Sequence, residues 1–164
     1  MAAAAGERVL LQVREVLERA CRKSDTLIRW GGDEFLVVAR GFDAANLEVI
    51  PERIRSSLEA TRYDLGNQQV AYMSCSMGFT CYPFGPAPEL WTLSLDQVVA
   101  VADRALYMAK RRGRNTWVGL MGTARTAIED ILQTIHESAD RAVARGGPTL
   151  ATRDDRPHAP SGSD

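Results

Sequence analysis

The sequence has no long run of apolar residues. A helix that spans a bilayer needs about 20 consecutive, mostly apolar residues, and no segment of the 164 residues approaches that length. Residues 1–5 also lack the basic start and the apolar centre of a signal peptide. We therefore expect a cytoplasmic chain without membrane contact of its own, and leave open that a full-length protein carries a membrane anchor upstream.

An excess of either charge is also lacking: 20 Lys and Arg residues stand against 21 Asp and Glu residues, for a net charge of -1. Proteins that bind nucleic-acid polymers or anionic membranes are basic over a whole surface, so we expect neither partner. A phosphate-bearing ligand would have to be held by a local cluster of arginines and lysines. The length and the apolar share of 45% are typical of one globular domain with its own core.

Cysteines are few, and they are not spaced as metal ligands. Cys21, Cys75 and Cys81 each lie in an apolar segment, which is typical of reduced thiols in a cytosolic core. The sequence has no internal repeat.

Apolar periodicity predicts the elements of the first part of the chain. Helical spacing of apolar residues predicts an amphipathic helix over residues 6–23. Two short apolar runs, 26–30 and 35–39, predict strands joined by a tight turn. A second helix is expected over 43–61, with a kink or a restart at Pro51, because proline suits a first helical turn.

The middle of the chain is expected to hold one long strand and one helix. Alternation over residues 67–81 predicts a half-buried strand, and residues 83–93 predict a loop. Ser94 and Gln97 then form a capping box, in which a serine cap is answered by a glutamine three residues on. The helix that follows is expected to stop at Gly113.

The last part of the chain is expected to add a strand and a helix. Residues 115–120 predict the strand, and 123–145 predict an amphipathic helix that ends at the Gly-Gly-Pro of 146–148. The remainder is rich in Pro, Ser, Asp and Arg, a composition typical of disorder. The expected divisions are a main domain, an added helix and a disordered tail: residues 1–122, 123–146 and 147–164. Helix, hairpin, helix and strand make up most of a ferredoxin-like βαββαβ unit, an α+β fold.

The turn between the first two strands holds two glycines and two acids: Gly31, Gly32, Asp33 and Glu34. Glycine accepts the positive φ that tight hairpin turns need, and it lets a ligand approach the backbone. Adjacent acids on an extended backbone point to opposite faces, so one can hold a metal ion while the other is fixed elsewhere. A plain β-turn with solvated acids is the alternative.

With Phe35 the motif reads GGDEF, and the chain resembles the GGDEF family of diguanylate cyclase domains over residues 6–120. The resemblance implies a nucleotidyl-cyclase-like fold, in which a central sheet that contains antiparallel strands is flanked by helices. The family's domain opens on a strand, whereas this chain opens directly on a helix. We therefore expect the first strand to be missing and the helix at 123–146 to be an extra element.

The resemblance also implies an activity. In the family, two domains paired as a homodimer each hold one GTP and join the two into cyclic di-GMP, with release of two pyrophosphates. Gly31, Gly32, Asp33 and Glu34 match the family's catalytic residues, and the two acids match its metal-binding positions. The implied cofactor is Mg²⁺, a hard cation that prefers carboxylate oxygens.

Three further residues match GTP-binding positions of the family. Lys110 and Arg114 lie four apart near a predicted helix end, hence on one face, and match the residues that bind the triphosphate. A solvated basic helix end is the alternative. Glu7 lies where the family has a guanine-reading Asp, and a carboxylate can accept from guanine N1 and N2. A first-turn acid that favours the helix dipole is the alternative.

Arg22 and Asp25 form an R-x-x-D motif just ahead of the first strand. It resembles the family's inhibitory site, which captures the product cyclic di-GMP. A guanidinium can pair with guanine O6 and N7 or with phosphate, and the carboxylate can accept from the guanine edge or hold the arginine. Arg53 matches a secondary arginine of such sites, and Arg29 is placed to stack on the ligand. A surface ion pair, a helix-surface Arg53 and a turn-flanking Arg29 are the alternatives.

One departure separates the chain from the family. The family's first strand and the helix after it supply another metal-binding Asp and a guanine-binding Asn, and nothing before Gly6 matches them. We therefore expect this chain to bind cyclic di-GMP better than it makes it. Three hypotheses stay open: a cyclase domain from a longer regulated protein, an inactive cyclic di-GMP receptor, and an assembly element whose helix at 123–145 pairs subunits.

Overall fold

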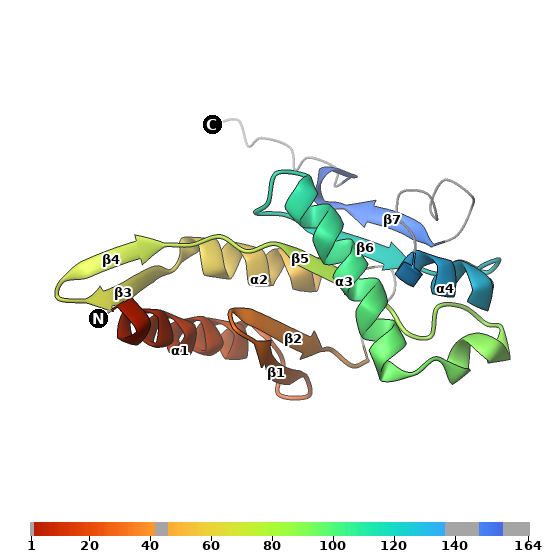
Figure 1. Ribbon diagram of the computed structural model, residues 1–164, viewed down its shortest axis with the longest axis horizontal. Helices are drawn as coiled ribbons and strands as arrows, with labels where there is room; N and C mark the ends of the chain where they lie inside the picture. Colours follow the sequence, from red (N-terminus) through yellow and green to blue (C-terminus); the bar gives the residue numbers. More distant parts are fainter. Residues whose placement is uncertain (1, 42–45, 137–147, 156–164) are drawn as a thin grey trace, which may run out of the picture. The chain divides into compact units, whose positions relative to one another are not determined.

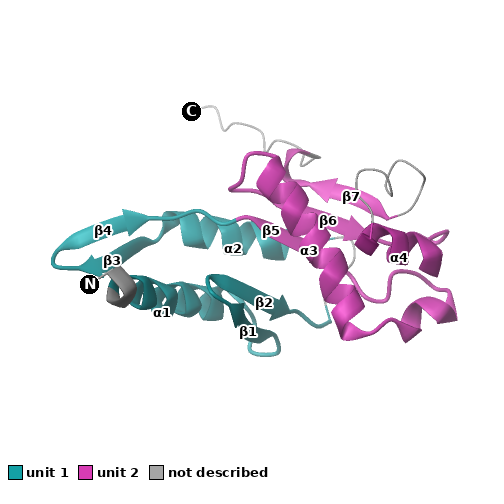
Figure 2. Ribbon diagram, in the orientation of Figure 1, with its two compact units in different colours: residues 1–75 teal, residues 76–164 magenta. Residues whose placement is uncertain are grey.

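The computed structural model describes residues 2–41, 46–136 and 148–155, and the chain divides into two compact units, residues 1–75 and 76–164 (Figure 2). The first unit holds these elements in chain order (Figure 1): α1 (Ala2–Ala20), β1 (Thr26–Gly31), β2 (Glu34–Val38), α2 (Val49–Ala60), β3 (Arg62–Gly66) and β4 (Gln69–Tyr72). The second unit holds β5 (Met77–Thr80), α3 (Leu95–Arg111), β6 (Trp117–Met121), α4 (Ile128–His136) and β7 (Thr149–Thr152), with short 3₁₀ helices at Pro88–Thr92 and Arg153–Asp155. The unit boundary at Cys75 falls inside the main domain that was expected over 1–122.

The core of the first unit lies where α1 packs on α2 and β3. Helical spacing puts the buried apolar residues of α1 on one face, as the sequence pattern predicts. The Tyr63 hydroxyl donates to the Leu58 carbonyl at 3.1 Å, so a buried phenol keeps a partner. The buried apolar residues are Val9, Val13, Val16, Leu17, Ala20, Ile54, Leu58 and Tyr63.

The predicted start of the second helix is wrong, because α2 begins at Val49. Pro51 lies in the first turn of α2, where the missing N–H costs no helical bond, as expected of a proline that suits a first helical turn. Residues 43–45 of the predicted helix lie outside the described residues.

The predicted long strand over 67–81 is also wrong. Asn67 and Gln68 have φ of 52° and 62° and form the turn of an antiparallel hairpin between β3 and β4. The chain then runs without a strand partner until β5. Alternation continues through the break, which is why the pattern resembles one strand. The strands of the described residues fall into three sheets, ordered β1-β2, β3-β4 and β5-β6-β7.

The second unit is built on the three-stranded sheet, in which β6 pairs in parallel with β5 and antiparallel with β7. Helix α3 packs on β5 and β6. It approaches so closely that a Cβ added at Gly78 would overlap backbone atoms of Ala102 and Leu106. The core residues of this unit are Phe84, Leu90, Leu93, Val101, Ala105, Met108, Ala109, Val118, Leu120 and Ile131.

The expected boundaries of α3 are confirmed. The Gln97 amide N–H donates to the Ser94 hydroxyl at 3.3 Å, and the Ser94 N–H donates to the Gln97 side chain at 2.8 Å, which completes the capping box. The helix ends at Arg111, two residues before Gly113. The short strand expected over 115–120 is confirmed as β6.

The C-terminal segment differs from the expectation in two respects. Helix α4 begins at Ile128, and the expected continuation over 137–145 lies outside the described residues. It packs on α3 with Ile131 buried, and the Arg104 guanidinium donates to the Ile135 carbonyl at 2.6 and 2.9 Å. Within residues 128–136, the apolar residues of α4 therefore pack against the core of their own unit. Pairing of subunits through the predicted helix over 123–145 stays a prediction. The expected disorder is wrong for residues 149–152, which form β7, while residues 156–164 lie outside the described part.

The predicted fold class is confirmed: the chain is a mixed α and β protein with helices packed on sheets that contain antiparallel pairs.

Candidate functional site

The signature turn, defined as residues 31–34, joins β1 and β2 as an antiparallel hairpin. The register shifts by one residue between Arg29 and Gly31, which leaves Trp30 as an extra residue on β1. Such bulges increase the local twist and re-aim neighbouring side chains. Gly32 has φ of 53°, a backbone conformation that residues with a Cβ rarely adopt. The predicted tight turn is therefore confirmed.

The space in front of the signature turn is open. A Cβ added at Gly31 or Gly32 would meet no atom within 4 Å, and all four residues of the turn are exposed. A ligand can therefore reach the backbone of both glycines and the carboxylates of Asp33 and Glu34 together.

The signature turn fits a metal ion that arrives with its substrate. Among the residues that the structure describes, no group of three or more His, Cys, Asp or Glu side chains is arranged to hold a metal ion by itself. Mg²⁺ is commonly bound by one or two carboxylates plus substrate phosphates and water. Asp33 and Glu34 supply two carboxylates at one exposed turn, which suits a magnesium–triphosphate complex.

Arg29 connects the signature turn to the start of α1. Its Nε donates to the Gly32 carbonyl at 3.1 Å, and its Nη1 donates to the Glu7 carboxylate at 3.1 Å. Two predicted residues from different sites, Glu7 and Arg29, thus lie in direct contact. Membership of Arg29 in the inhibitory site stays a prediction, since its observed partners belong to the turn and to α1.

The R-x-x-D motif forms a tight turn after α1. The Arg22 N–H donates to Oδ2 of Asp25 at 2.8 Å, and the Asp25 N–H donates to the Arg22 carbonyl at 3.0 Å. The carboxylate is therefore fixed by the backbone, and the Arg22 side chain is exposed. A surface ion pair within the motif, the alternative considered for it, does not describe this bonding.

Polar atoms without a partner occur on Asp25 in this turn and on Arg53 of α2. Within the described residues, Oδ1 of Asp25 and Nε and Nη2 of Arg53 are buried without a hydrogen-bond partner. The pKa of the Cys21 thiol is raised by burial and by the negative Asp25, while the positive Arg53 lowers it. Both charges therefore act on the same thiol. Unpaired buried polar groups cost roughly 1–3 kcal/mol each, so these atoms are candidates for contact with a ligand.

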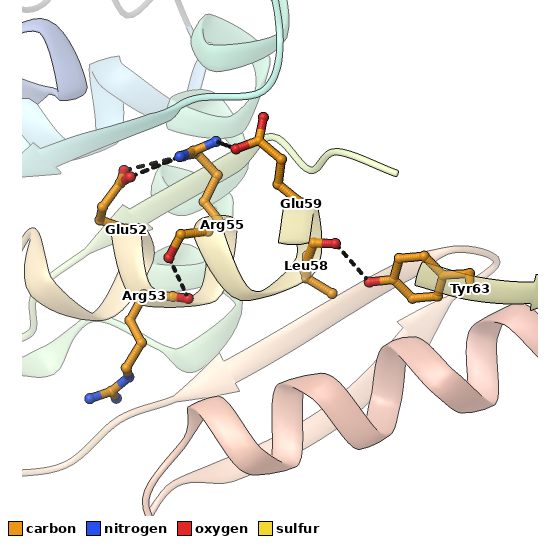
Figure 3. A network of polar contacts seen from close by, with 7 residues as sticks. Glu52, Arg53, Arg55, Leu58, Glu59 and Tyr63 are labelled. Atoms are coloured by element: carbon orange, nitrogen blue, oxygen red, sulfur yellow. Dashed lines mark hydrogen bonds and ion pairs between the residues drawn. The ribbon is translucent and has the colours of Figure 1, made fainter. Parts of the chain in front are cut away.

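Arg55 lies two residues after Arg53 on α2, and in contrast to Arg53 its guanidinium has partners within the protein (Figure 3). It donates to Glu52 through Nη2 at 2.9 Å and through Nε at 3.2 and 3.3 Å, and to Glu59 through Nη1 at 2.8 Å. These bonds, those of Glu52 first, raise the pKa of Arg55. Sequence reasoning missed this buried arginine. The signal that was available is its pair of glutamates three residues before and four residues after it, the spacing of helical ion pairs.

The basic segment, defined as residues 110–115, corrects one prediction. Lys110 lies in the last turn of α3, whereas Arg114 lies beyond the helix end, so the argument that both share one helix face is wrong. Gly113, Arg114 and Asn115 have φ of 100°, 63° and 47°, three left-handed residues in succession. This conformation turns the chain sharply after α3, and the Arg114 N–H donates to the Ala109 carbonyl at 3.3 Å. The basic segment belongs to the second unit and the signature turn to the first.

The fold and the signature turn together describe a class of protein: a mixed α and β protein with an acidic hairpin turn that contains two glycines. The sequence matches the family described as "Diguanylate cyclase, GGDEF domain" over residues 3–116. The chain belongs to the GGDEF family.

Named relatives agree with this assignment. The chain is 36% identical over 112 residues to "Diguanylate cyclase DosC" of Escherichia coli K12, which covers 67% of this chain and 22% of that protein. It is 33% identical over 112 residues to "Diguanylate cyclase A" of Treponema denticola, covering 68% of this chain and 28% of that protein. The chain therefore spans about a quarter of the length of these relatives.

A solved structure supports the fold. The GGDEF domain of TpbB, or YfiN, from Pseudomonas aeruginosa is similar with a TM-score of 0.58 and 24% identity, covering 82% of this chain and 70% of that one. No helix in the described ranges is long and apolar enough to cross a bilayer.

Proposed function

We propose that this chain is the nucleotide-condensing part of a diguanylate cyclase. The ribose 3′-hydroxyl of one GTP attacks the α-phosphate of a second GTP held by another copy of the domain, and the bond to pyrophosphate breaks. The 3′-hydroxyl of the second nucleotide then attacks the α-phosphate of the first, and the bond to its pyrophosphate breaks, which closes the ring. Two GTP thus give cyclic di-GMP, two pyrophosphates and two protons. The observation that carries this proposal is the exposed, glycine-opened turn with two carboxylates in a chain of the GGDEF family.

The proposed roles follow from the chemistry of each side chain. Asp33 and Glu34 would hold Mg²⁺, which would supply neutralisation of the phosphate charge and activation of the attacking hydroxyl. Lys110 and Arg114 bind the triphosphate through charge-assisted hydrogen bonds. Glu7 accepts from the guanine edge. The two glycines of the turn keep side chains away from the nucleotide.

Product analysis tests the activity. The intact chain is incubated with GTP and MgCl₂, and cyclic di-GMP and pyrophosphate are quantified by chromatography. We expect product to form slowly with the wild type, since this chain is expected to bind cyclic di-GMP better than it makes it. With Asp33→Asn, which lacks one carboxylate for the metal ion, we expect at least about 100-fold less product. Arg14→Ala, which removes an exposed ion pair on α1, is the control and retains activity. Absence of product from the wild type contradicts the proposed activity.

A second candidate function is that of a cyclic di-GMP receptor. The observation that favours it is the set of unpartnered atoms on Asp25 and Arg53. An acceptor oxygen and guanidinium donors complement the guanine edge, which offers N1 and N2 donors together with O6 and N7 acceptors. Arg22, which shares its turn with Asp25, is exposed and adds a further cation for the phosphates.

Calorimetry with cyclic di-GMP tests the receptor. Hydrogen bonds to charged groups contribute about 1.5–3 kcal/mol, so we expect Arg22→Ala to weaken binding roughly 10- to 150-fold. Arg14→Ala serves again as the matched control. Equal affinity of the wild type and Arg22→Ala excludes this site, whatever the outcome of the product analysis.

A further inference from the structure

Arg29 is the residue whose contacts the proposed function does not use. It lies on β1, and its guanidinium reaches both the Gly32 carbonyl of the signature turn and the Glu7 carboxylate of α1, each at 3.1 Å. Glu7 and Gly32 are 25 positions apart in the sequence, yet one side chain is bonded to both.

Stability does not account for this contact. The side chains of Arg29 and Glu7 are 45% and 57% exposed, and an exposed ion pair contributes little to the free energy of unfolding. Arg14 and Glu18 form a similar exposed pair at 2.8 Å, but they join two residues of one helix. What distinguishes Arg29 is therefore the pair of elements that it connects.

Two features make Arg29 suited to fixing a geometry. A guanidinium is planar and presents its donors at fixed angles, so two simultaneous bonds restrict the positions of both acceptors. The Gly32 carbonyl belongs to the left-handed residue that immediately precedes Asp33. Restricting this carbonyl also restricts the backbone from which the Asp33 carboxylate extends.

Glu7 keeps acceptor capacity after this bond. A carboxylate offers about four lone-pair sites on two oxygens, and Oε1 receives one bond from Arg29. The remaining sites are available to the N1 and N2 donors of guanine. Adenine presents an acceptor at N1 in their place, which would face a carboxylate without a proton between them.

We propose that Arg29 is a positioning residue that sets nucleobase selection: it holds the Glu7 carboxylate for guanine in a fixed relation to the Asp33 turn. The proposal rests on the proposed function, in which Glu7 accepts from the guanine edge. The position of the carboxylate that recognises guanine and the position of the turn that carries Asp33 then depend on the same Arg29 guanidinium.

Nucleotide binding tests the proposal. Dissociation constants of GDP, IDP and ADP are measured by calorimetry with MgCl₂ on the intact chain, since diphosphates carry no pyrophosphate leaving group and are not condensed. IDP lacks the guanine 2-amino group. We expect the wild type to prefer GDP over IDP roughly tenfold or more, as expected for one charged hydrogen bond. For Arg29→Ala we expect the dissociation constant of IDP to exceed that of GDP only by a factor between about 1 and 3, while Arg14→Ala retains the wild-type preference.

The outcomes separate the two claims. If the wild type does not bind GDP, the proposed function fails, and the inference fails with it. If the wild type discriminates and Arg29→Ala discriminates equally, the proposed function stands and Arg29 has no positioning role. Thermal unfolding of each variant shows whether it is folded, and Arg29→Lys, which keeps the charge without the planar fork, is expected to lose the ratio as Arg29→Ala does.

A second readout needs no ligand. We expect amide hydrogen exchange of residues 32–34 to accelerate in both Arg29→Ala and Glu7→Ala, but not in Arg14→Ala, because only the first two remove the connection between Arg29 and Glu7. A double variant should show little beyond either single variant, since both break the same contact. Unchanged exchange in both single variants overturns the proposal.

Discussion

Two sides of one helix show how differently the buried nitrogens of an arginine can be used. Arg53 and Arg55 lie two residues apart on α2, which directs them to different sides of the helix (Figure 3). Arg55 donates to Glu52 and Glu59, and its side chain is 5% exposed. Arg53 has two buried nitrogens without a partner among the described residues.

The difference separates a structural charge from a candidate ligand contact. A buried charge is tolerated when its bonds are made within the protein, as they are for Arg55. A buried donor without a partner costs free energy in the absence of a ligand, and that cost is recovered when a ligand accepts from it. Only the side of α2 that carries Arg53 is therefore expected to respond to cyclic di-GMP.

The largest expected effect is on the side of Arg55. Replacement by alanine, Arg55→Ala, removes the guanidinium bonds to the partly buried Glu52, so we expect a loss of about 3 kcal/mol in the free energy of unfolding. Urea denaturation of the intact chain measures it. A loss under about 1 kcal/mol would show that the two glutamates find water without cost and that the two sides do not differ.

Arg53→Ala is expected to act on binding and not on stability. Removing unpaired donors offsets the packing that the side chain provides, so the free energy of unfolding should change by less than about 1 kcal/mol. Affinity for cyclic di-GMP should fall roughly 10- to 100-fold. Calorimetry and urea denaturation on the same preparation measure both, with Arg14→Ala as control. Lower stability with unchanged affinity would reverse the assignment of the two arginines.

The two glutamates that bind Arg55 can also be compared with each other. Glu52 is 16% exposed and receives bonds from two guanidinium nitrogens, whereas Glu59 is 48% exposed and receives one of the bonds that the structure describes. We expect Glu52→Gln to cost about 1–2 kcal/mol and Glu59→Gln about 0.5 kcal/mol or less. Equal costs in urea denaturation would mean that burial does not decide the strength of these pairs.

The smallest expected effect is on the alkylation rates of two cysteines, Cys75 near Arg55 and Cys21 near Arg53. Burial raises the pKa of Cys75 to about 11, and Arg55 opposes this shift, while Arg53 opposes the raised pKa of Cys21. Removing either arginine should raise the pKa of its own cysteine further, which lowers the thiolate fraction at a given pH and slows alkylation. Peptide mass spectrometry after iodoacetamide treatment at pH 9 resolves the two rates. Slowing of both thiols by either variant would show that the two sides are not independent.

Features set by neighbouring residues could be predicted from the sequence. The signature turn needs a positive φ at Gly32, and the capping box needs Ser94 and Gln97 three apart. Both are local requirements that the residue types satisfy by themselves. The hairpin and the start of α3 were accordingly predicted correctly.

Contacts between distant residues could not be predicted in the same way. The bond between Glu7 and Arg29 joins residues 22 positions apart, and β7 depends on a partner strand about 30 positions earlier in the chain. Alternation over 67–81 was misleading because a hairpin and a following strand keep the same period. Arg114 was placed on a helix face because the sequence does not show where the helix stops to within a few residues.

The sequence by itself determined the family and the acidic turn, because the residue types and their order carry the turn conformation and the carboxylates. Only the tertiary structure decided which charged side chains are paired and which are not. Arg53 and Arg55 have the same chemistry in the sequence, and their difference arises from what lies on each side of α2. Burial and partner geometry are properties of packed elements, and no local pattern encodes them.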